Sequence, residues 1–146
     1  MSNMKNDLIY VDSNVFIYSI ISKNEKIISK SKDIILSIAK GNVQAITSLL
    51  TWDEFARIVQ KHLGYEYAVI EGGKFLNMPC LNFIDVNFNV INKAQEIMKT
   101  YRLNPRDSIH AATAIMNNAT KILTNDTDFD NLKELKRISV ENFKAQ

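Results

Sequence analysis

Short apolar runs alternate along the chain with longer amphipathic segments. The runs are too continuous for half-exposed strands, and such continuity is typical of strands that are covered on both faces. Four runs predict strands, and a weaker fifth is a candidate: Leu8–Val11, Val43–Ile46, Leu81–Val86, Lys121–Leu123 and Arg137–Val140. The pattern therefore predicts a sheet that is buried between other elements.

The segments between these runs have the periodicity of helices. We expect helices at Val15–Ser22, Glu25–Lys40, Trp52–Leu63, Glu66–Asn77, Asn89–Tyr101 and Pro105–Asn118. Gly41 and Gly64 are C-terminal stop signals, whereas Gly72 and Gly73 are expected to interrupt the fourth helix. Strands that alternate with helices predict an α/β fold with three layers, α/β/α, around a central parallel sheet of about four to five strands.

The composition favours one domain over residues 1–146, because the chain has two prolines, four glycines, no repeat and no low-complexity tract. The single cysteine, Cys80, has no partner for an intrachain disulfide and no histidine or cysteine at zinc-ligand spacing. The N-terminus is polar and then places Asp12 at the end of the first apolar run, which is not typical of a secretory signal. No run reaches the roughly 18 apolar residues of a membrane span. We therefore expect a cytoplasmic protein without a membrane anchor.

The net charge of +2, from 18 basic and 16 acidic residues, is too small to indicate nucleic-acid binding by itself. Its distribution matters more. Four acids committed to a metal would leave the rest of the surface more positive, which would favour a polyanion.

Acids follow the ends of the predicted strands, where the ligand crevice of an open parallel sheet lies. Asp12 follows the first run directly, Glu54 lies in the first helical turn after the second run, and Asp126 comes three residues after Lys121–Leu123. Asp107 lies in the first turn of the helix that leads into that last strand. Clustered carboxylates repel one another unless protons or a divalent cation neutralise them. Hard oxygen ligands without a nearby histidine or cysteine cluster indicate Mg²⁺ or Mn²⁺.

Each acid also has an explanation in local structure. Asp12 is a suitable helix N-cap, and Thr51 with Glu54 spells a capping box. Asp107 follows Asn104 and Pro105, an N-cap and a first helical residue, so it would complement the helix dipole. Turn and capping residues precede a short helix expected at Asn131–Leu135; they are Asn125, Asp126, Asp128 and Asp130. Capping alone does not explain why all four acids converge on one end of one sheet.

Four motifs resemble those of PIN-domain ribonucleases, especially the VapC-like toxins of toxin–antitoxin pairs. The resemblance runs from Val11 to Phe129. The motifs are V-D-S-N-V-F-I-Y at 11–18, T-W-D-E-F at 51–55, P-R-D-S-I-H-A-A-T-A at 105–114 and I-L-T-N-D-T-D-F at 122–129. Their order and spacing imply a PIN-like fold and a metal-dependent endoribonuclease, with RNA as substrate and an antitoxin protein as a possible partner.

The resemblance implies roles for particular residues. Asp12 and Asp107 would be the principal metal ligands, and Glu54 and Asp126 would bind directly or through water. The last motif leaves Asp126 and Asp128 open as the fourth acid. Supporting and phosphate-positioning roles are expected for Asn14, Thr124, Arg106 and Arg57. His110 shares a helix face with Asp107; a general base is one interpretation, and packing beside the site is the plainer one.

Three other functions share parts of this pattern. Haloacid-dehalogenase phosphatases also place an aspartate after the first strand, but they need a second acid where this chain has Asn14, and Lys121 precedes its strand. A response-receiver domain needs paired acids after the first strand and a lysine after the last, and neither is present. A non-catalytic PIN-like module that binds RNA or a protein would gain nothing from repelling carboxylates.

We also expect a homodimer, because the helices Trp52–Leu63 and Glu66–Asn77 carry more apolar residues than one core face requires.

Overall fold

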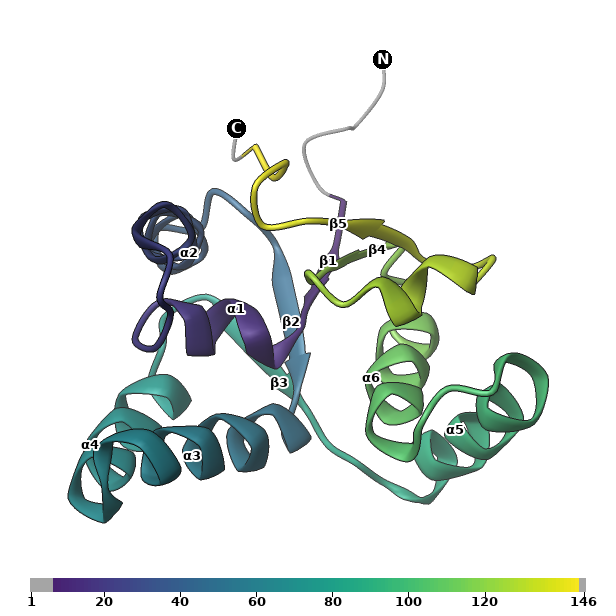
Figure 1. Ribbon diagram of the computed structural model, residues 1–146. Helices are drawn as coiled ribbons and strands as arrows, with labels where there is room; N and C mark the ends of the chain where they lie inside the picture. The colour runs from purple at the N-terminus through teal and green to yellow at the C-terminus, as the bar shows by residue number, and fades with distance from the viewer. Residues whose placement is uncertain (1–6, 145–146) are drawn as a thin grey trace.

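Five parallel strands form a single sheet in the computed structural model, which describes residues 7–144 (Figure 1). The strands are β1 (Ile9–Val11), β2 (Ala45–Ser48), β3 (Leu81–Ile84), β4 (Lys121–Leu123) and β5 (Lys136–Ile138). Their order in the sheet is β3-β2-β1-β4-β5, so β1 lies at the centre. The predicted parallel sheet is therefore confirmed, including its weaker fifth strand.

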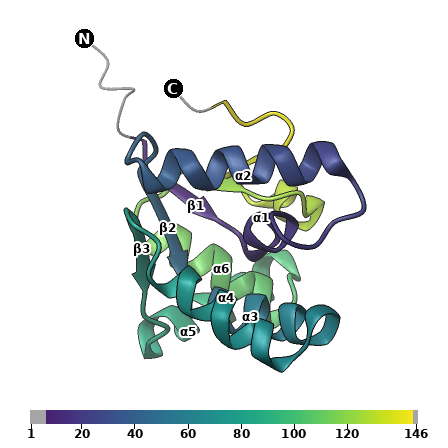
Figure 2. The same ribbon diagram turned by 90° about the vertical axis from the view of Figure 1, so that its left-hand side faces the viewer.

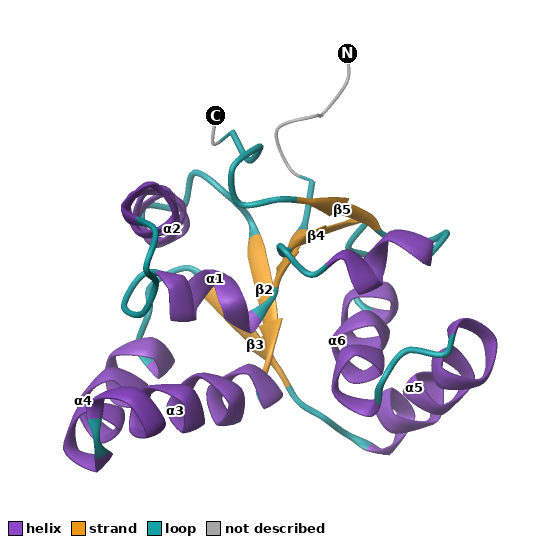
Figure 3. Ribbon diagram, viewed as in Figure 1, coloured by secondary structure: helices purple, strands orange, loops and turns teal. Residues whose placement is uncertain are grey.

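Helices cover both faces of this sheet (Figure 3). They are α1 (Ser13–Tyr18), α2 (Glu25–Ala39), α3 (Leu50–Leu63), α4 (Tyr65–Leu76), α5 (Phe88–Tyr101) and α6 (Pro105–Met116), with a short 3₁₀-helix, η2, at Thr127–Asn131. Side chains alternate along a strand, and in β1 Ile9 and Val11 join one core while Tyr10 joins the other. The first core packs against α1 to α4 and the second against α5 and α6. The three-layer α/β/α prediction is confirmed.

Capping side chains move several boundaries away from the predicted ones. α1 begins at Ser13, two residues early, because the Asp12 carboxylate accepts the Ser13 N–H. The short helix expected at Asn131–Leu135 is wrong. A 3₁₀-helix ends at Asn131 instead, because Asp126 caps it four residues earlier than we expected.

Two further predictions in the α3–α4 region are wrong. β2 continues to Ser48, so α3 begins at Leu50, its N-cap position is Leu49, and Thr51 does not form a capping box. Thr51 is buried instead, and its hydroxyl is hydrogen-bonded to that of Thr47. α4 is continuous through Gly72 and Gly73, because its packing on α3 outweighs the low helix propensity of glycine.

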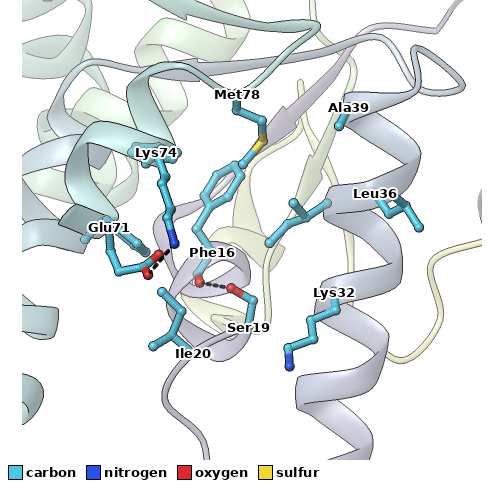
Figure 4. Close-up of a pocket in the computed structure, with 12 residues that line it drawn as sticks. Phe16, Ser19, Ile20, Lys32, Leu36, Ala39, Glu71, Lys74 and Met78 are labelled. Carbon is cyan, nitrogen blue, oxygen red and sulfur yellow. Dashed lines mark hydrogen bonds and ion pairs between the residues drawn. The ribbon is translucent and has the colours of Figure 1, made fainter. Parts of the chain in front are cut away.

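An apolar groove lies on the α1–α4 side of the molecule. Figure 2 shows α1 between α2 on one side and α3 and α4 on the other. The groove has a volume of about 500 Å³, and its lining includes Phe16, Ile20, Leu36 and Met78 (Figure 4). None of the four predicted metal-binding acids lines it. Within residues 7–144, no helix is both long and apolar enough to cross a membrane. The N-terminal segment that bears on a secretory signal lies partly outside the described residues, at positions 1–6.

Candidate metal centre

Asp12 lies where the central strand β1 ends and α1 begins. The residue is buried, with 6% of its surface exposed. One carboxylate oxygen, Oδ1, accepts the Ser13 N–H at 2.8 Å, and Oδ2 accepts the Thr124 hydroxyl at 2.7 Å. Burial raises the pKa of Asp12, and so does the charge of Glu54, although His110 and the hydrogen bonds from Thr124 and Ser13 oppose this. Capping and participation in the acidic cluster therefore coexist in this one side chain.

Thr124 links three parts of the site from the end of β4. Its hydroxyl donates to Asp12, because a carboxylate can only accept, and it accepts from Asn14 Nδ2 at 3.0 Å and from the Asp126 N–H at 3.0 Å. These contacts fix the orientation of the Asn14 amide. Its other atom, the buried Oδ1, has no hydrogen-bond partner within residues 7–144. A buried acceptor of this kind needs a donor or a cation from outside the protein.

Glu54 projects from the second turn of α3 and is held by His110 of α6. The distance from His110 Nε2 to Glu54 Oε1 is 2.5 Å, and the same nitrogen lies 3.6 Å from Asp12 Oδ1. His110 is fully buried. Burial alone would lower the pKa of His110. Tyr10 and the carboxylates of Glu54 and Asp12 outweigh this effect and raise the pKa to well above 6.5. The structure thus places Glu54 beside Asp12, with a histidine between their carboxylates and the core.

Asp107 lies in the first turn of α6, beside the N-cap residue Asn104. The Asn104 side chain accepts the Asp107 N–H at 2.9 Å and donates to Asp107 Oδ2 at 2.8 Å. Burial raises the pKa of Asp107 to about 6, with further contributions from the charges of Asp126 and Asp12. The Asp107 carboxylate is therefore close enough to Asp126 and Asp12 for their charges to destabilise its ionised form.

Asp126 and Asp128 lie close to Asp107, near the end of β4. Asp126 caps η2 by accepting the Asp128 N–H at 2.9 Å. One carboxylate oxygen from each of Asp107, Asp126 and Asp128 lies within 4.8 Å of the others. Both candidates for the fourth acid thus remain within reach of the same ion.

Two groups of possible ligands therefore meet at the carboxyl end of the sheet. The first comprises Asp12, Glu54 and His110, also with ligand atoms within 4.8 Å of one another, and the second comprises Asp107, Asp126 and Asp128. The raised pKa values of Asp12 and Asp107 and the unpartnered Asn14 oxygen all fit a bound divalent cation. The carboxylate oxygens suit Mg²⁺ or Mn²⁺.

The two predicted arginines differ in position. Arg106 lines a cavity of about 430 Å³ together with Glu54 and Asp107. Arg57 pairs instead with Asp53 on the exposed face of α3, at 3.5 Å, and lines a separate cavity with Trp52. The structure therefore brings Arg106 to the acids but not Arg57.

Other residues near the acids were not predicted from the sequence. The pKa of Tyr18 is raised by burial and by the charges of Asp12, Glu141 and Asp126. Tyr10 contacts His110 from beneath the site. Neither tyrosine carries a sequence signal, because each lies in an ordinary apolar run. Lys121, the residue considered for a phosphatase, contacts Asp7 at 3.4 Å, at the amino end of β4.

Comparison with known proteins identifies the family. The family model described as "PIN domain" matches residues 9–135. The chain belongs to the PIN-domain family. No curated protein sequence matches it significantly.

Several solved structures share this PIN fold. A structure of VapBC2 from Rickettsia felis bound to a promoter DNA fragment is 20% identical, covers 90% of this chain and 98% of its own, and gives a TM-score of 0.70. The sarcin–ricin loop cleaving toxin VapC20 of Mycobacterium tuberculosis is 16% identical over 84% of this chain and 92% of its own, with a TM-score of 0.69. FitAcB from Neisseria gonorrhoeae is 17% identical over 92% of this chain and 99% of its own, with a TM-score of 0.66. At these identities the likeness establishes a shared VapC-like fold.

Proposed function

We propose that this protein is an endoribonuclease that depends on Mg²⁺ or Mn²⁺ and acts as the toxin of a toxin–antitoxin pair. The PIN family, to which the chain belongs, is a family of nucleases. The observation that carries the proposal is the convergence of Asp12, Glu54, Asp107 and Asp126 at the carboxyl end of the sheet. Such a cluster costs stability in the free protein and is therefore expected to serve a ligand.

Each residue of the cluster has a part in binding and orientation. When bound, a divalent ion supplies charge neutralisation and activation of water for in-line attack on a phosphodiester. Asp12 and Asp107 would hold it most directly, with Glu54 and with Asp126 or Asp128 as further ligands, directly or through water. Thr124 and Asn14 hold Asp12 in place. Arg106 at the rim would bind an RNA phosphate.

The first prediction concerns the metal and Asp12. RNA cleavage should require Mg²⁺ or Mn²⁺, and Asp12→Asn should lower its rate at least about tenfold because a charged ligand is lost. Asp33→Asn is the control, since Asp33 is exposed on α2, remote from the cluster. A gel assay on a single-stranded or loop RNA measures both effects. Undiminished cleavage in excess chelator would refute the proposal.

The proposed antitoxin would occupy the apolar groove of Figure 4. Three of the similar solved structures are described as VapBC or FitAB assemblies bound to DNA. By analogy, coexpression with the product of a neighbouring small gene should suppress RNA cleavage. Leu36→Glu in the groove should restore cleavage, whereas Ile91→Glu on α5 should not; both side chains are exposed, so neither change disturbs the core. Equal suppression in all three proteins would exclude the groove.

A further inference from the structure

Three elements that are far apart in the chain meet at the His110 ring. His110 lies on α6, Tyr10 on β1 and Glu54 on α3. The ring is fully buried, with Nε2 at 2.5 Å from Glu54 Oε1 and Nδ1 hydrogen-bonded to the Tyr10 hydroxyl. The Tyr10 and His110 rings meet edge to face, with centroids 5.7 Å apart. The imidazole is therefore held at both nitrogens rather than merely packed.

Tyr10 is in turn fixed to the backbone at the end of the neighbouring strand. Its side chain is fully buried, and its hydroxyl oxygen accepts the Ser48 N–H at 3.2 Å. Ser48 is the last residue of β2, and its own hydroxyl accepts the Leu50 N–H at 3.1 Å, where α3 begins. The chain of contacts thus runs from Glu54 on α3 through His110 and Tyr10 back to the β2–α3 connection, just before the helix that carries Glu54.

The two ends of this chain define its effect on Glu54. A carboxylate can only accept, so His110 Nε2 carries the proton and donates it to Oε1. Within residues 7–144, the Glu54 carboxylate accepts a hydrogen bond at Oε1 alone. One oxygen of Glu54 is therefore fixed from behind, and the other is left for a ligand in front.

We propose that His110 and Tyr10 are positioning residues, which hold the Glu54 carboxylate in the orientation that a divalent cation requires. The inference deepens the proposed function, because it takes Glu54 as a ligand of that cation. In this role neither residue would coordinate the cation itself, because Glu54 and Tyr10 already occupy the two ring nitrogens of His110. Groups that hydrogen-bond to metal ligands from behind typically change metal affinity or activity about 10- to 100-fold when removed.

Two substitutions at position 110 separate positioning from packing. The amide nitrogen of a glutamine lies near the place of Nε2, so His110→Gln keeps a donor for Glu54. The shorter side chain in His110→Asn places its nitrogen near Nδ1 and leaves Glu54 without a donor. Both changes remove the ring from a fully buried position, so both should lower stability to a similar degree.

Binding of Mn²⁺, followed by the loss of the free-ion EPR signal, is the readout. We expect His110→Asn to weaken Mn²⁺ binding about tenfold and His110→Gln to stay within about threefold of the wild type. Tyr10→Phe removes only a hydroxyl and should weaken binding about two- to fivefold, so it carries the test if His110→Asn fails to fold. Thr113→Val is the control: Thr113 is equally buried on α6, and its hydroxyl bonds within the helix to the Ile109 carbonyl.

Two outcomes would overturn the proposal, and a third would overturn only the proposed function. Equal losses in the Asn and Gln variants would mean that the ring itself matters, as packing or as a direct metal ligand. Unchanged or tighter Mn²⁺ binding in His110→Asn and Tyr10→Phe would mean that they do not orient Glu54. A wild-type protein that binds Mn²⁺ and shows the expected order among variants, yet cleaves no RNA, would refute the proposed function and leave the positioning role intact.

Discussion

Asp107 is the residue at which charge, stability and the proposed function are most closely connected. Its pKa is raised to about 6 by burial and by the charges of Asp126 and Asp12. Above that pH the metal-free protein therefore holds a carboxylate in a place that disfavours its charge. A bound cation would neutralise this charge. The same carboxylate would therefore destabilise the metal-free protein and stabilise the metal-bound one.

Replacing Asp107 with asparagine should separate these two effects. Asp107→Asn keeps an oxygen that can accept from Asn104 Nδ2 and removes the charge. In EDTA at neutral pH we expect a variant at least as stable as the wild type in urea unfolding. With Mg²⁺ we expect cleavage to fall at least about tenfold, because a ligand is lost. Asp85→Asn is the control, since Asp85 is an exposed aspartate that follows strand β3 and is not part of the cluster.

The same shift in the pKa of Asp107 predicts a pH dependence. A group whose pKa is raised on folding binds its proton more tightly in the folded state, so its stabilising contribution is complete below the unfolded pKa of 3.8 and is lost as the pH rises through about 6. Metal-free wild type should therefore lose stability relative to Asp107→Asn between about pH 4 and 7. Thermal melts of both proteins in EDTA measure the difference, and a constant difference across that range would contradict the raised pKa.

Elements, unlike single residues, were predictable mainly where burial determines them. The apolar runs located the first four strands, because buried strands leave that pattern. The fifth matched only the weaker candidate, because β5 is a partly exposed strand at the edge of the sheet. Boundaries were less predictable, because they depend on which side chain reaches which N–H: Asp126 begins η2, and the Ser48 hydroxyl accepts the Leu50 N–H where α3 begins. The local sequence suggested that Thr51 caps the start of α3. Thr51 is buried instead, and its hydroxyl is hydrogen-bonded to that of Thr47.

The residues of the candidate site also differ in how far the sequence predicts their positions. The carboxyl ends of parallel strands meet at one edge of the sheet, so the placement of Asp12 and Asp126 follows from the strand pattern alone. The contacts of Glu54 with His110 and of His110 with Tyr10 depend on how α3 and α6 approach β1. No spacing in the sequence encodes that approach. The sequence therefore indicated only that His110 packs beside the site or acts as a general base, and its contacts with Glu54 and Tyr10 were not predicted.

Helix α4 offers an element-scale prediction at its two adjacent glycines. A Cβ at Gly73 would meet nothing within 4 Å, whereas one at Gly72 would lie 3.2 Å from Trp52 Nε1. Gly73→Ala should therefore stabilise the protein by about 0.5 to 1 kcal/mol through helix propensity. Gly72→Ala should gain less, because Trp52 must shift. Urea unfolding of the two variants provides the comparison, and a larger gain at Gly72 would contradict the contact.

At the scale of the whole molecule, the α3–α4 pair presents an unusually apolar surface to solvent. Tyr65 is 70% exposed, Val69 58% and Ile70 57%, with Tyr67 and Trp52 nearby at 54% and 42%. Figure 1 shows this pair at one end of the molecule, with α5 and α6 across the sheet. Several large apolar side chains exposed on one pair of helices are typical of an interface. The surface supports the expectation of a homodimer, which stays a prediction.

A substitution on α4 tests that prediction. A symmetric dimer buries the same patch on both subunits, so a charge placed there enters the interface twice and costs its burial twice. Ile70→Lys should therefore convert a dimer to a monomer in sedimentation velocity at micromolar concentrations. Ile91→Lys is the control, because Ile91 is also exposed, at 42%, but lies on α5. Since Ile70 is remote in sequence from every proposed metal ligand, Mn²⁺ binding should be retained in the monomer. A monomeric wild type would leave the apolar α3–α4 surface to another partner.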